Sequence, residues 1–483
     1  MSRIVIGPFN RVEGDLEVTL DVENGIVREA RVSASLYRGF EQLLLGRPAG
    51  DALAIAPRIC GICSVSQSLA AAAVLRAAQP IAPAPNGLIA TNIAHAAENI
   101  ADHLTHFYVF FMPDFARAAY AGRPWHEATE ARFKAVSGAA LREALPARAR
   151  LLETMGLIAG KWPHSLAFRP GGVTRALALG DEMRLLALIA DFRAFLERAL
   201  FSAPLDAVIG LASARELDRF VEGAGAAGDF ATFIRIARDL GLEEMGPGPG
   251  LLLTAGAYLG PEGHRFPAGL LDCATALLRE PPLSRVEEDV SHAYMRDTAA
   301  DPARAETLPD MRREGAYSFA KAPRLEGRAV EVGALARQAV AGHPLIRDLL
   351  ARRGASNVFA RIVARVLEIA LLTRAMEDWT RALAPREPYC VADAPLADGP
   401  FVGFVEAARG TLGHWATFRD GQIERYQIIA PTTWNFSPRD AAGNPGPLEQ
   451  ALAGLAVGEE GATNVAVQHI VRSFDPCMVC TAH

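Results

Sequence analysis

Two pairs of cysteines are the residues of this sequence best suited to chemistry. Cys60 and Cys63 lie in the segment Arg-Ile-Cys-Gly-Ile-Cys, and Cys477 and Cys480 lie in Asp-Pro-Cys-Met-Val-Cys. Thiolates are soft ligands that bind zinc, nickel and iron–sulfur clusters, and closely spaced thiols also form redox-active dithiols. From the spacing alone a structural zinc site is the leading hypothesis, with an iron–sulfur centre, a redox dithiol and nickel as open alternatives.

The overall cysteine content favours metal or redox chemistry over a disulfide framework. Six cysteines in 483 residues are too few to stabilise a fold by disulfides. The other two, Cys273 and Cys390, stand alone, and we expect both to be small buried hydrophobic residues. A chain this large and apolar has little need of a structural metal, which weakens the zinc hypothesis. The two pairs can form one site only if the fold brings them together.

Two hairpins are predicted, one toward each end of the sequence. Apolar and polar residues alternate over 16–32, with Asn24-Gly25 at the expected turn. A similar pattern covers 415–429, with Asp420-Gly421 at the turn. We therefore expect small antiparallel sheets near both termini.

Helical spacing of apolar residues fills the middle of the chain. The predicted helices cover residues 64–78, 91–119, 139–157, 182–201, 361–383 and 463–474. The first directly follows Cys63, so the first thiol pair is expected near a helix N-terminus, where the helix dipole favours thiolate. We expect a mainly α (α+β) fold in which the termini meet at a buried metal site. It is predicted to be a single domain over 1–483, with an N-terminal hairpin region (1–36), a helical body (64–384) and a C-terminal metal-binding region (400–483).

Composition makes several classes of partner unexpected. The formal net charge of -6 leaves no broad basic face for phosphates, so nucleic acid is not an expected partner. No window is long and apolar enough for a membrane span, since even the Ala-rich stretch from Ser68 is interrupted by Arg76. The first residues lack the apolar core of an export signal, so we expect a cytoplasmic chain unless a signal-bearing partner exports it.

Eight motifs spread over the chain together resemble the large subunit of nickel–iron hydrogenases. In the order that the family shows, they are Arg11-Val-Glu-Gly14, Arg38-Gly-Phe-Glu41, Arg58-Ile-Cys-Gly-Ile-Cys63, Asp102-His-Leu-Thr-His-Phe-Tyr108, Glu406-Ala-Ala-Arg-Gly410, Gly413-His-Trp415, Ala430-Pro-Thr-Thr-Trp-Asn435 and Asp475-Pro-Cys-Met-Val-Cys480. Each motif is weak alone, but the ordered set with both cysteine pairs is specific. The resemblance implies an enzyme that splits H2 into protons and electrons at a nickel–iron centre.

The resemblance also implies a role for each thiol. Cys60 and Cys477 match terminal nickel ligands, and Cys63 and Cys480 match bridges to an iron that carries carbon monoxide and two cyanide ligands. Soft thiolates suit nickel. The Cys477 thiolate would take the proton formed from H2, and Glu13 matches the carboxylate that relays it onward.

Further residues match positions around the diatomic ligands of the iron. Arg409 matches a guanidinium set over iron-bound cyanide, and Thr432 resembles a second donor to cyanide. Asp102 and Asp475 match carboxylates that orient Arg409 and the cysteine loop. Without the resemblance, Arg409 would be interpreted as a solvated or salt-bridged surface group, and Asp102 and Asp475 as helix caps or surface charges.

A magnesium ion and an electron-accepting partner are implied as well. Glu41, the backbone carbonyl of Ile428 and His483 match the magnesium ligands of the family. Because the chain has no further cysteine cluster, iron–sulfur clusters are expected only in a partner, the iron–sulfur small subunit, bound through a broad apolar interface.

Several departures refine the resemblance. Gln67 and Asp15 stand where His is usual, and Ala408 stands where Pro is common. Gln67 resembles the regulatory, H2-sensing branch of the family. The sequence stops at His483 without the usual extension, as expected of a mature form or of that branch.

Two bulky residues also resemble the regulatory branch. Ile62 and Phe110 occupy gas-channel positions where smaller Val and Leu are common, and a packed channel narrowed by extra methylenes still passes H2. Helical spacing predicts Phe110 on one core-facing side with His103, His106 and Phe107. This interpretation predicts an oxygen-tolerant H2 sensor of low turnover that signals to a histidine kinase.

Three other interpretations compete with the sensor. A catalytic uptake hydrogenase feeding a respiratory chain would have the same site but high turnover and oxygen inactivation. A zinc-stabilised scaffold would contain zinc without iron. A hydrogenase-derived quinone-reducing subunit has little support, because such subunits generally lack the cysteine pairs kept here.

Overall fold

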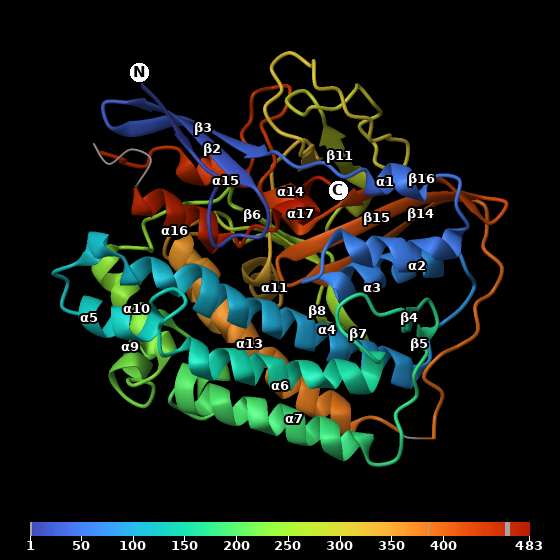
Figure 1. Ribbon diagram of the computed structural model, residues 1–483, viewed down its shortest axis with the longest axis horizontal. Helices are drawn as coiled ribbons and strands as arrows, with labels where there is room; N and C mark the ends of the chain where they lie inside the picture. The colour runs from blue at the N-terminus through green and yellow to red at the C-terminus, as the bar shows by residue number, and fades with distance from the viewer. Residues whose placement is uncertain (1, 385, 459–463) are drawn as a thin grey trace.

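The helical body is organised around one long buried helix, α13 (Val358–Arg381). The computed structural model describes residues 2–384, 386–458 and 464–483. The side chain of Asn357 caps α13 by accepting the backbone N–H of Ala360 at 2.9 Å. The helix packs against α4 (Pro85–Thr105) and α7 (Asp181–Phe195), and α6 (Leu141–Ala159) lies against both of these (Figure 1).

Shorter helices surround this body and extend to the C-terminus. They are α1 (Phe40–Leu44), α2 (Ala52–Ile55), α3 (Ser64–Ala77), α5 (His126–Phe133), α8 (Leu205–Ile209), α9 (Ala214–Glu222), α10 (Asp229–Leu240), α11 (Ala334–Val340), α12 (Pro344–Ala351), α14 (Pro431–Asn435), α15 (Pro447–Leu452), α16 (Val465–Ser473) and α17 (Met478–Thr481). The predicted fold class, mainly helical with small sheets, is confirmed. In the described part of the chain, no helix is long and apolar enough to cross a membrane.

Both predicted hairpins are present, each as part of a three-stranded antiparallel sheet. The first sheet joins β1 (Ser2–Ile6), β2 (Leu16–Glu23) and β3 (Ile26–Ala34). The second joins β14 (Gly399–Ala407), β15 (Gly410–Arg419) and β16 (Gln422–Ile429). Asn24-Gly25 and Asp420-Gly421 all have positive φ, as primed hairpin turns require.

Several short strands in the middle of the chain lack a signal in the sequence. They are β4 (Phe168–Arg169), β5 (Gly172–Val173), β6 (Leu251–Thr254), β7 (Ala257–Gly260), β8 (Gly263–Phe266), β9 (Gly269–Asp272), β10 (Leu278–Arg279), β11 (Val286–Asp289), β12 (Ala322–Leu325) and β13 (Glu331–Val332). Four of them form a sheet of order β10-β9-β6-β13, in which β13 runs parallel to β6. Strands of two to four residues are too short to show an alternating pattern.

The predicted helix over 91–119 is wrong in its second half. Helix α4 ends at Thr105, and the chain continues as a π-helical segment, His106–Phe111, and a 3-10 segment, Met112–Ala116. The wider π turn shifts the register of the side chains. His103, His106 and Phe107 are buried, whereas Phe110 is only half-buried. The predicted helix over 463–474 is α16, although Thr463 itself lies outside the described residues.

The two ends of the chain meet beside the second cysteine pair. The backbone of Glu13 pairs with that of Cys477, and the N–H of Met478 donates to the Glu13 carbonyl at 2.6 Å. A Cβ atom at Gly14, which has φ 83°, would lie 3.1 Å from Met478 Cβ, so this close approach requires glycine. Figure 1 shows the blue N-terminal strands and the red C-terminal helices on the same side of the molecule.

Candidate metal centre

Four cysteine sulfurs converge on one site, where Cys63 is half-buried and the other three are buried. The Sγ atoms of Cys60, Cys63, Cys477 and Cys480 all lie within 4.8 Å of one another. Cys60 and Cys477 are 3.6 Å apart, Cys63 and Cys480 are 3.3 Å apart, and Cys477 and Cys480 are 3.2 Å apart. These separations far exceed the roughly 2 Å of a disulfide bond, so the four are free thiols.

The charge balance of the four thiols fits a soft metal cation. The hydrogen bond from Cys477 holds the pKa of Cys60 well below its usual value, whereas the hydrogen bond with Cys477 raises the pKa of Cys63 well above it. One thiolate is thus favoured, and further negative charges repel one another in a buried site. A cation with an affinity for sulfur removes this conflict, and four convergent thiolates are the ligand set for zinc, iron or nickel.

The first pair is set by the N-terminus of helix α3. Cys63 directly precedes Ser64, the first residue of the helix, and the Gln67 N–H donates to the Cys63 carbonyl at 3.0 Å. The buried carboxyl of Glu98, on α4, accepts the N–H groups of Val65 and Ser66 at 2.8 and 2.9 Å. Burial raises the pKa of Glu98 to about 7. Glu98 therefore caps the turn that holds Cys63, as an acceptor supplied by another helix.

Arg409 links the two predicted carboxylates. Its Nη2 lies 2.9 Å from Asp102 Oδ1 and donates to Asp475 Oδ1 at 3.2 Å, and its Nε donates to the Asp475 carbonyl at 2.9 Å. Among the described residues no acceptor pairs with its Nη1. Nearby Asp102, Asp475 and Cys477 keep the guanidinium charged, with a pKa well above its usual value despite burial. A buried, charged donor with a free N–H beside four thiols fits an anionic group at the centre.

Asp102 and Asp475 differ in pKa although both are buried. Burial raises the pKa of Asp102 to about 7, and the opposing effect of the Arg409 charge is smaller. In the described structure, neither carboxyl oxygen of Asp102 has a hydrogen-bond partner, although Oδ1 lies in an ion pair with Arg409. Burial also acts on Asp475, but Arg409, His106 and Arg365 outweigh it and hold the pKa of Asp475 below its usual value. Arg365 donates to Asp475 Oδ2 at 3.4 Å and to the Phe474 carbonyl at 2.9 Å. The loop before Cys477 is thus anchored by charge.

Thr432 and Glu13 both border the second cysteine pair. The Thr432 hydroxyl, on α14, accepts the Cys477 N–H at 3.1 Å, so its own proton is free to donate elsewhere. Glu13 is half-buried, and burial together with the nearby Cys60 raises the pKa of its carboxyl. Its backbone N–H donates to the Pro476 carbonyl at 3.4 Å. A carboxyl with a raised pKa beside thiols can accept and release a proton.

The three predicted magnesium ligands lie together in a second buried cluster. His483 Nε2 is 2.8 Å from the Ile428 carbonyl oxygen and 3.3 Å from Glu41 Oε1. The Ile428 N–H donates to the same Glu41 oxygen at 3.1 Å, and His483 Nδ1 lies 3.0 Å from the Cys480 carbonyl. A carboxylate, a carbonyl and an imidazole fit a hard cation in type. The cluster joins the end of α17 to β16 and α1.

The two predicted gas-channel residues, Ile62 and Phe110, are both half-buried. Ile62 is half-buried and packs with the apolar cluster that includes Cys60. Phe110 is half-buried in the π-helical segment, where its carbonyl accepts Arg11 Nη1 at 2.8 Å. Gln67 is buried and its Oε1 lies 2.9 Å from His414 Nε2.

Sequence reasoning missed Glu98 and Arg365. Glu98 lies four residues before Asp102 on one helix, so helical periodicity places it on the same face, a signal that was available. Arg365 lies in a nearly uniformly apolar helical pattern, and nothing in its local sequence indicates its distant partner Asp475.

Comparisons with known proteins agree with this centre. The sequence pattern of the nickel-dependent hydrogenases matches residues 38–137 and 115–483. The periplasmic [NiFeSe] hydrogenase large subunit of Desulfomicrobium baculatum is 29% identical over 100% of this chain and 95% of its own length. The uptake hydrogenase large subunit of Azotobacter chroococcum mcd 1 is 26% identical over 100% and 95%.

A solved structure has the same fold over its whole length. The Ni-Fe-Se hydrogenase from D. vulgaris Hildenborough in the reduced state superposes with a TM-score of 0.84 at 30% identity, covering 100% of both chains. The family pattern covers both cysteine pairs and nearly the entire sequence. Buried thiols from both ends of the chain, a fold shared from end to end and this match together show that the chain belongs to the nickel-dependent hydrogenase family, as a large subunit.

Proposed function

We propose that this chain binds and heterolytically splits H2 at a nickel–iron centre held by Cys60, Cys63, Cys477 and Cys480. The observation that carries the proposal is the convergence of these four thiols within 4.8 Å, supplied by both ends of the chain, with Cys63 half-buried and the other three buried. A nickel–iron pair with carbon monoxide and cyanide on the iron would supply the two-electron chemistry that converts H2 into two protons and two electrons.

Three side chains of this chain act on the proton and on the ligands of the iron. The Cys477 Sγ takes up the proton, and the Glu13 carboxyl, whose backbone is bonded to the Cys477 loop, receives it next. Arg409 holds a fixed positive charge and a free N–H for cyanide. The free proton of the Thr432 hydroxyl suits the second donor role.

The cluster of Glu41, Ile428 and His483 is proposed to hold magnesium. Its support is the convergence of carboxylate, carbonyl and imidazole in a buried space. A cation there would tie the C-terminus to β16 and replace the direct contact between His483 and Glu41.

Electrons must leave through a partner. The remaining cysteines, Cys273 and Cys390, lie in separate parts of the described structure and form no cluster there. We propose an iron–sulfur small subunit as the acceptor, which the large-subunit names of the relatives support. A cytoplasmic heterodimer that signals to a histidine kinase completes the proposal.

The regulatory role rests on Ile62, Phe110 and Gln67. Bulky side chains at the first two positions would hinder O2 more than H2. The second candidate, a catalytic uptake enzyme, is favoured by the similarity to the uptake hydrogenase of Azotobacter chroococcum mcd 1. The two roles differ in turnover and in their response to air.

Hydrogen-isotope exchange between H2 and D2O tests both parts of the proposal. The purified complex should form HD, and Cys477→Ser should abolish it, whereas Cys273→Ser, which alters a cysteine outside the centre, should not. Slow exchange that persists after exposure to air is expected of the sensor. Fast exchange that air abolishes would assign the uptake role, and absence of HD from nickel-loaded wild-type protein would contradict H2 splitting.

A further inference from the structure

Arg409 is presented to the thiol cluster by a turn that its own sequence does not favour. Strands β14 and β15 are joined by two residues, Ala408 and Arg409, between the paired residues Ala407 and Gly410. The favoured two-residue hairpin turns, types I′ and II′, have positive φ at the first central position. Neither Ala408 nor Arg409 has positive φ, and the positive value, 131°, falls on Gly410 instead. We therefore expect contacts from elsewhere in the fold to help hold this turn.

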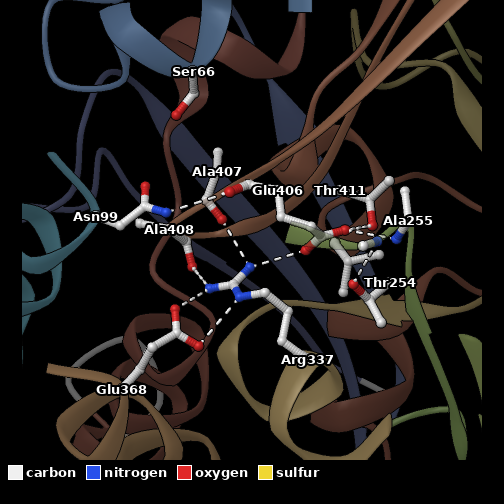
Figure 2. Close-up of polar contacts among 12 residues, drawn as sticks. Ser66, Asn99, Thr254, Ala255, Arg337, Glu368, Glu406, Ala407, Ala408 and Thr411 are labelled. Atoms are coloured by element: carbon white, nitrogen blue, oxygen red, sulfur yellow. Dashed lines mark hydrogen bonds and ion pairs between the residues drawn. The ribbon is translucent and has the colours of Figure 1, made fainter. Parts of the chain in front are cut away.

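The guanidinium of Arg337 supplies those contacts. Its Nη1 donates to the Ala407 carbonyl at 2.8 Å, and its Nη2 donates to the Ala408 carbonyl at 2.9 Å. Figure 2 shows the guanidinium at the centre of this network, facing both carbonyls. The preceding carbonyl, that of Glu406, accepts the side-chain amide of Asn99 at 3.3 Å. Three consecutive carbonyls before Arg409 are thus bound by side chains of other elements.

Two buried carboxylates hold the guanidinium in place. Glu368 on α13 accepts Nη2 at 2.6 Å and Nε at 3.2 Å, and Glu406 accepts Nη1 at 3.0 Å. These three bonds and the two to carbonyls use all five N–H groups of the arginine. The side chains of Arg337, Glu368 and Glu406 are each 0% exposed. A saturated and fully buried fork has one orientation available.

The helix that carries Arg337 also touches the turn directly. Helix α11 begins after Gly333, and the Arg337 N–H donates to the Gly333 carbonyl at 3.0 Å. A Cβ atom at Gly410 would lie 2.5 Å from Val332 Cγ2 and 2.7 Å from Gly333 N. The turn is therefore enclosed by the start of α11 on one side and by the Arg337 fork on another.

We propose that Arg337 is a positioning residue, which binds the carbonyls of Ala407 and Ala408 and so fixes the turn that presents Arg409 to the four-cysteine centre. Its effect on the centre rests on the function proposed above, whereas its effect on the turn does not. Lysine at this position keeps the charge but offers three donors on a flexible stem in place of a planar fork. It cannot bind two carbonyls and two carboxylates at once.

Arg337→Lys tests the proposal, with Arg324→Lys as the matched control. Arg324 is also buried and bonds a carboxylate, Asp440, and the carbonyls of Pro323 and Pro438, none of which belongs to the turn. Hydrogen–deuterium exchange of the peptide over 405–412 reports the turn, and infrared bands of iron-bound cyanide report Arg409. Both are measured on the purified complex with its small subunit.

Arg337→Lys should speed exchange of this peptide by roughly tenfold and shift the cyanide bands, and it should lower the H2–D2O exchange rate by about ten- to a hundredfold. Arg324→Lys should leave all three unchanged. Unchanged peptide exchange and bands in Arg337→Lys, or equal changes in the control, would overturn the proposal. Wild-type protein without cyanide bands would contradict the proposed function, while the peptide exchange would still decide the role of Arg337.

Glu368→Gln keeps the test decisive if Arg337→Lys does not assemble. Glutamine has the shape of glutamate but accepts fewer hydrogen bonds, so it weakens the anchor without removing the arginine. The same changes are expected at smaller size. Wild-type exchange over 405–412 in an assembled Glu368→Gln complex would assign Arg337 a purely structural role and overturn the proposal.

Discussion

Glu13 is the carboxyl that we propose exchanges protons with the cysteine centre. Its backbone is bonded to the Cys477 loop, and burial raises the pKa of its side chain. A raised pKa brings the group closer to the working pH, where it can both accept and release a proton.

Replacing Glu13 by glutamine should remove proton transfer without removing the metals. We expect Glu13→Gln to lower H2–D2O exchange by at least about a hundredfold, since glutamine cannot carry the proton. Nickel and iron contents should match wild type, because the variant leaves the thiols intact. Glu17→Gln, at an exposed position on β2, is the control and should exchange at the wild-type rate. Wild-type exchange in Glu13→Gln would show that protons leave by another group.

At the residue scale, sequence identified site residues where a local motif marked them. The four site cysteines, Arg409, Asp102 and Asp475 lie in the quoted motifs, and His483 closely follows the last motif. The structure places these residues in two clusters. Arg337 and Glu368 were not found, because Arg337 lies 31 residues from Glu368 and 71 residues from Ala408, and no local pattern records such a pairing. The roles of the motif residues as metal ligands and as donors to cyanide remain predictions.

Helix α3 and strand β14 form the packed unit that carries Cys63. Gly403 on β14 faces the α3 backbone so closely that a Cβ atom there would collide with Val74 N and Ala73 C. Helix α3 cannot move away from β14 freely, because Glu98 on α4 binds the backbone N–H groups of its first turn.

Gly403→Ala should therefore disturb the cysteine centre by displacing helix α3, and not by altering a metal ligand. We expect a loss of about 1–3 kcal/mol in stability, the usual cost of overpacking, together with reduced nickel content. Thermal unfolding and metal analysis measure the two effects. Gly50→Ala is the control, because a Cβ atom at Gly50 meets nothing within 4 Å. Equal behaviour of the two variants would contradict the packing argument.

At the element scale, the sequence predicted long periodic segments well and irregular ones poorly. Both Gly-containing hairpin turns and the long helices were predicted, because their patterns repeat over many residues. The π-helical segment after Thr105 was not, because a wider turn leaves no signature in apolar spacing. The sheet that contains β6 and β13 depends on pairing across nearly 80 residues of chain and has no local signal.

The whole molecule is closed by contacts between its N-terminal and C-terminal regions. Glu449 on α15 accepts the Val32 N–H of β3 at 3.0 Å and the Tyr317 hydroxyl at 2.8 Å. Burial raises the pKa of Glu449 to about 7, from an ordinary value of 4.5. The meeting of the termini was predicted from the two cysteine pairs. The joint that Glu449 forms with Val32 and Tyr317 was not predicted. The single-domain organisation remains a prediction.

The joint makes stability depend on pH in a defined direction. The folded state binds the Glu449 proton more tightly than the unfolded state. The contribution of Glu449 to the free energy of unfolding is therefore full below about pH 4.5 and is lost as pH rises through about 7. The side chain in Glu449→Gln stays uncharged at every pH. The free energy of unfolding of wild type should therefore fall by on the order of 3 kcal/mol relative to this variant over that pH range. Thermal unfolding of both from pH 5 to 8 measures the change. A constant difference in Tm would contradict it.

Infrared spectroscopy of the purified complex, before and after H2 is added, tests whether the four cysteines hold a nickel–iron centre. We expect bands of iron-bound carbon monoxide and cyanide in nickel-containing protein, and these bands should shift when H2 is added. Bands that survive air would support the regulatory role as well. Absence of these bands from a complex that has metal bound at the four cysteines would contradict the nickel–iron centre. It would instead favour a structural metal at this site.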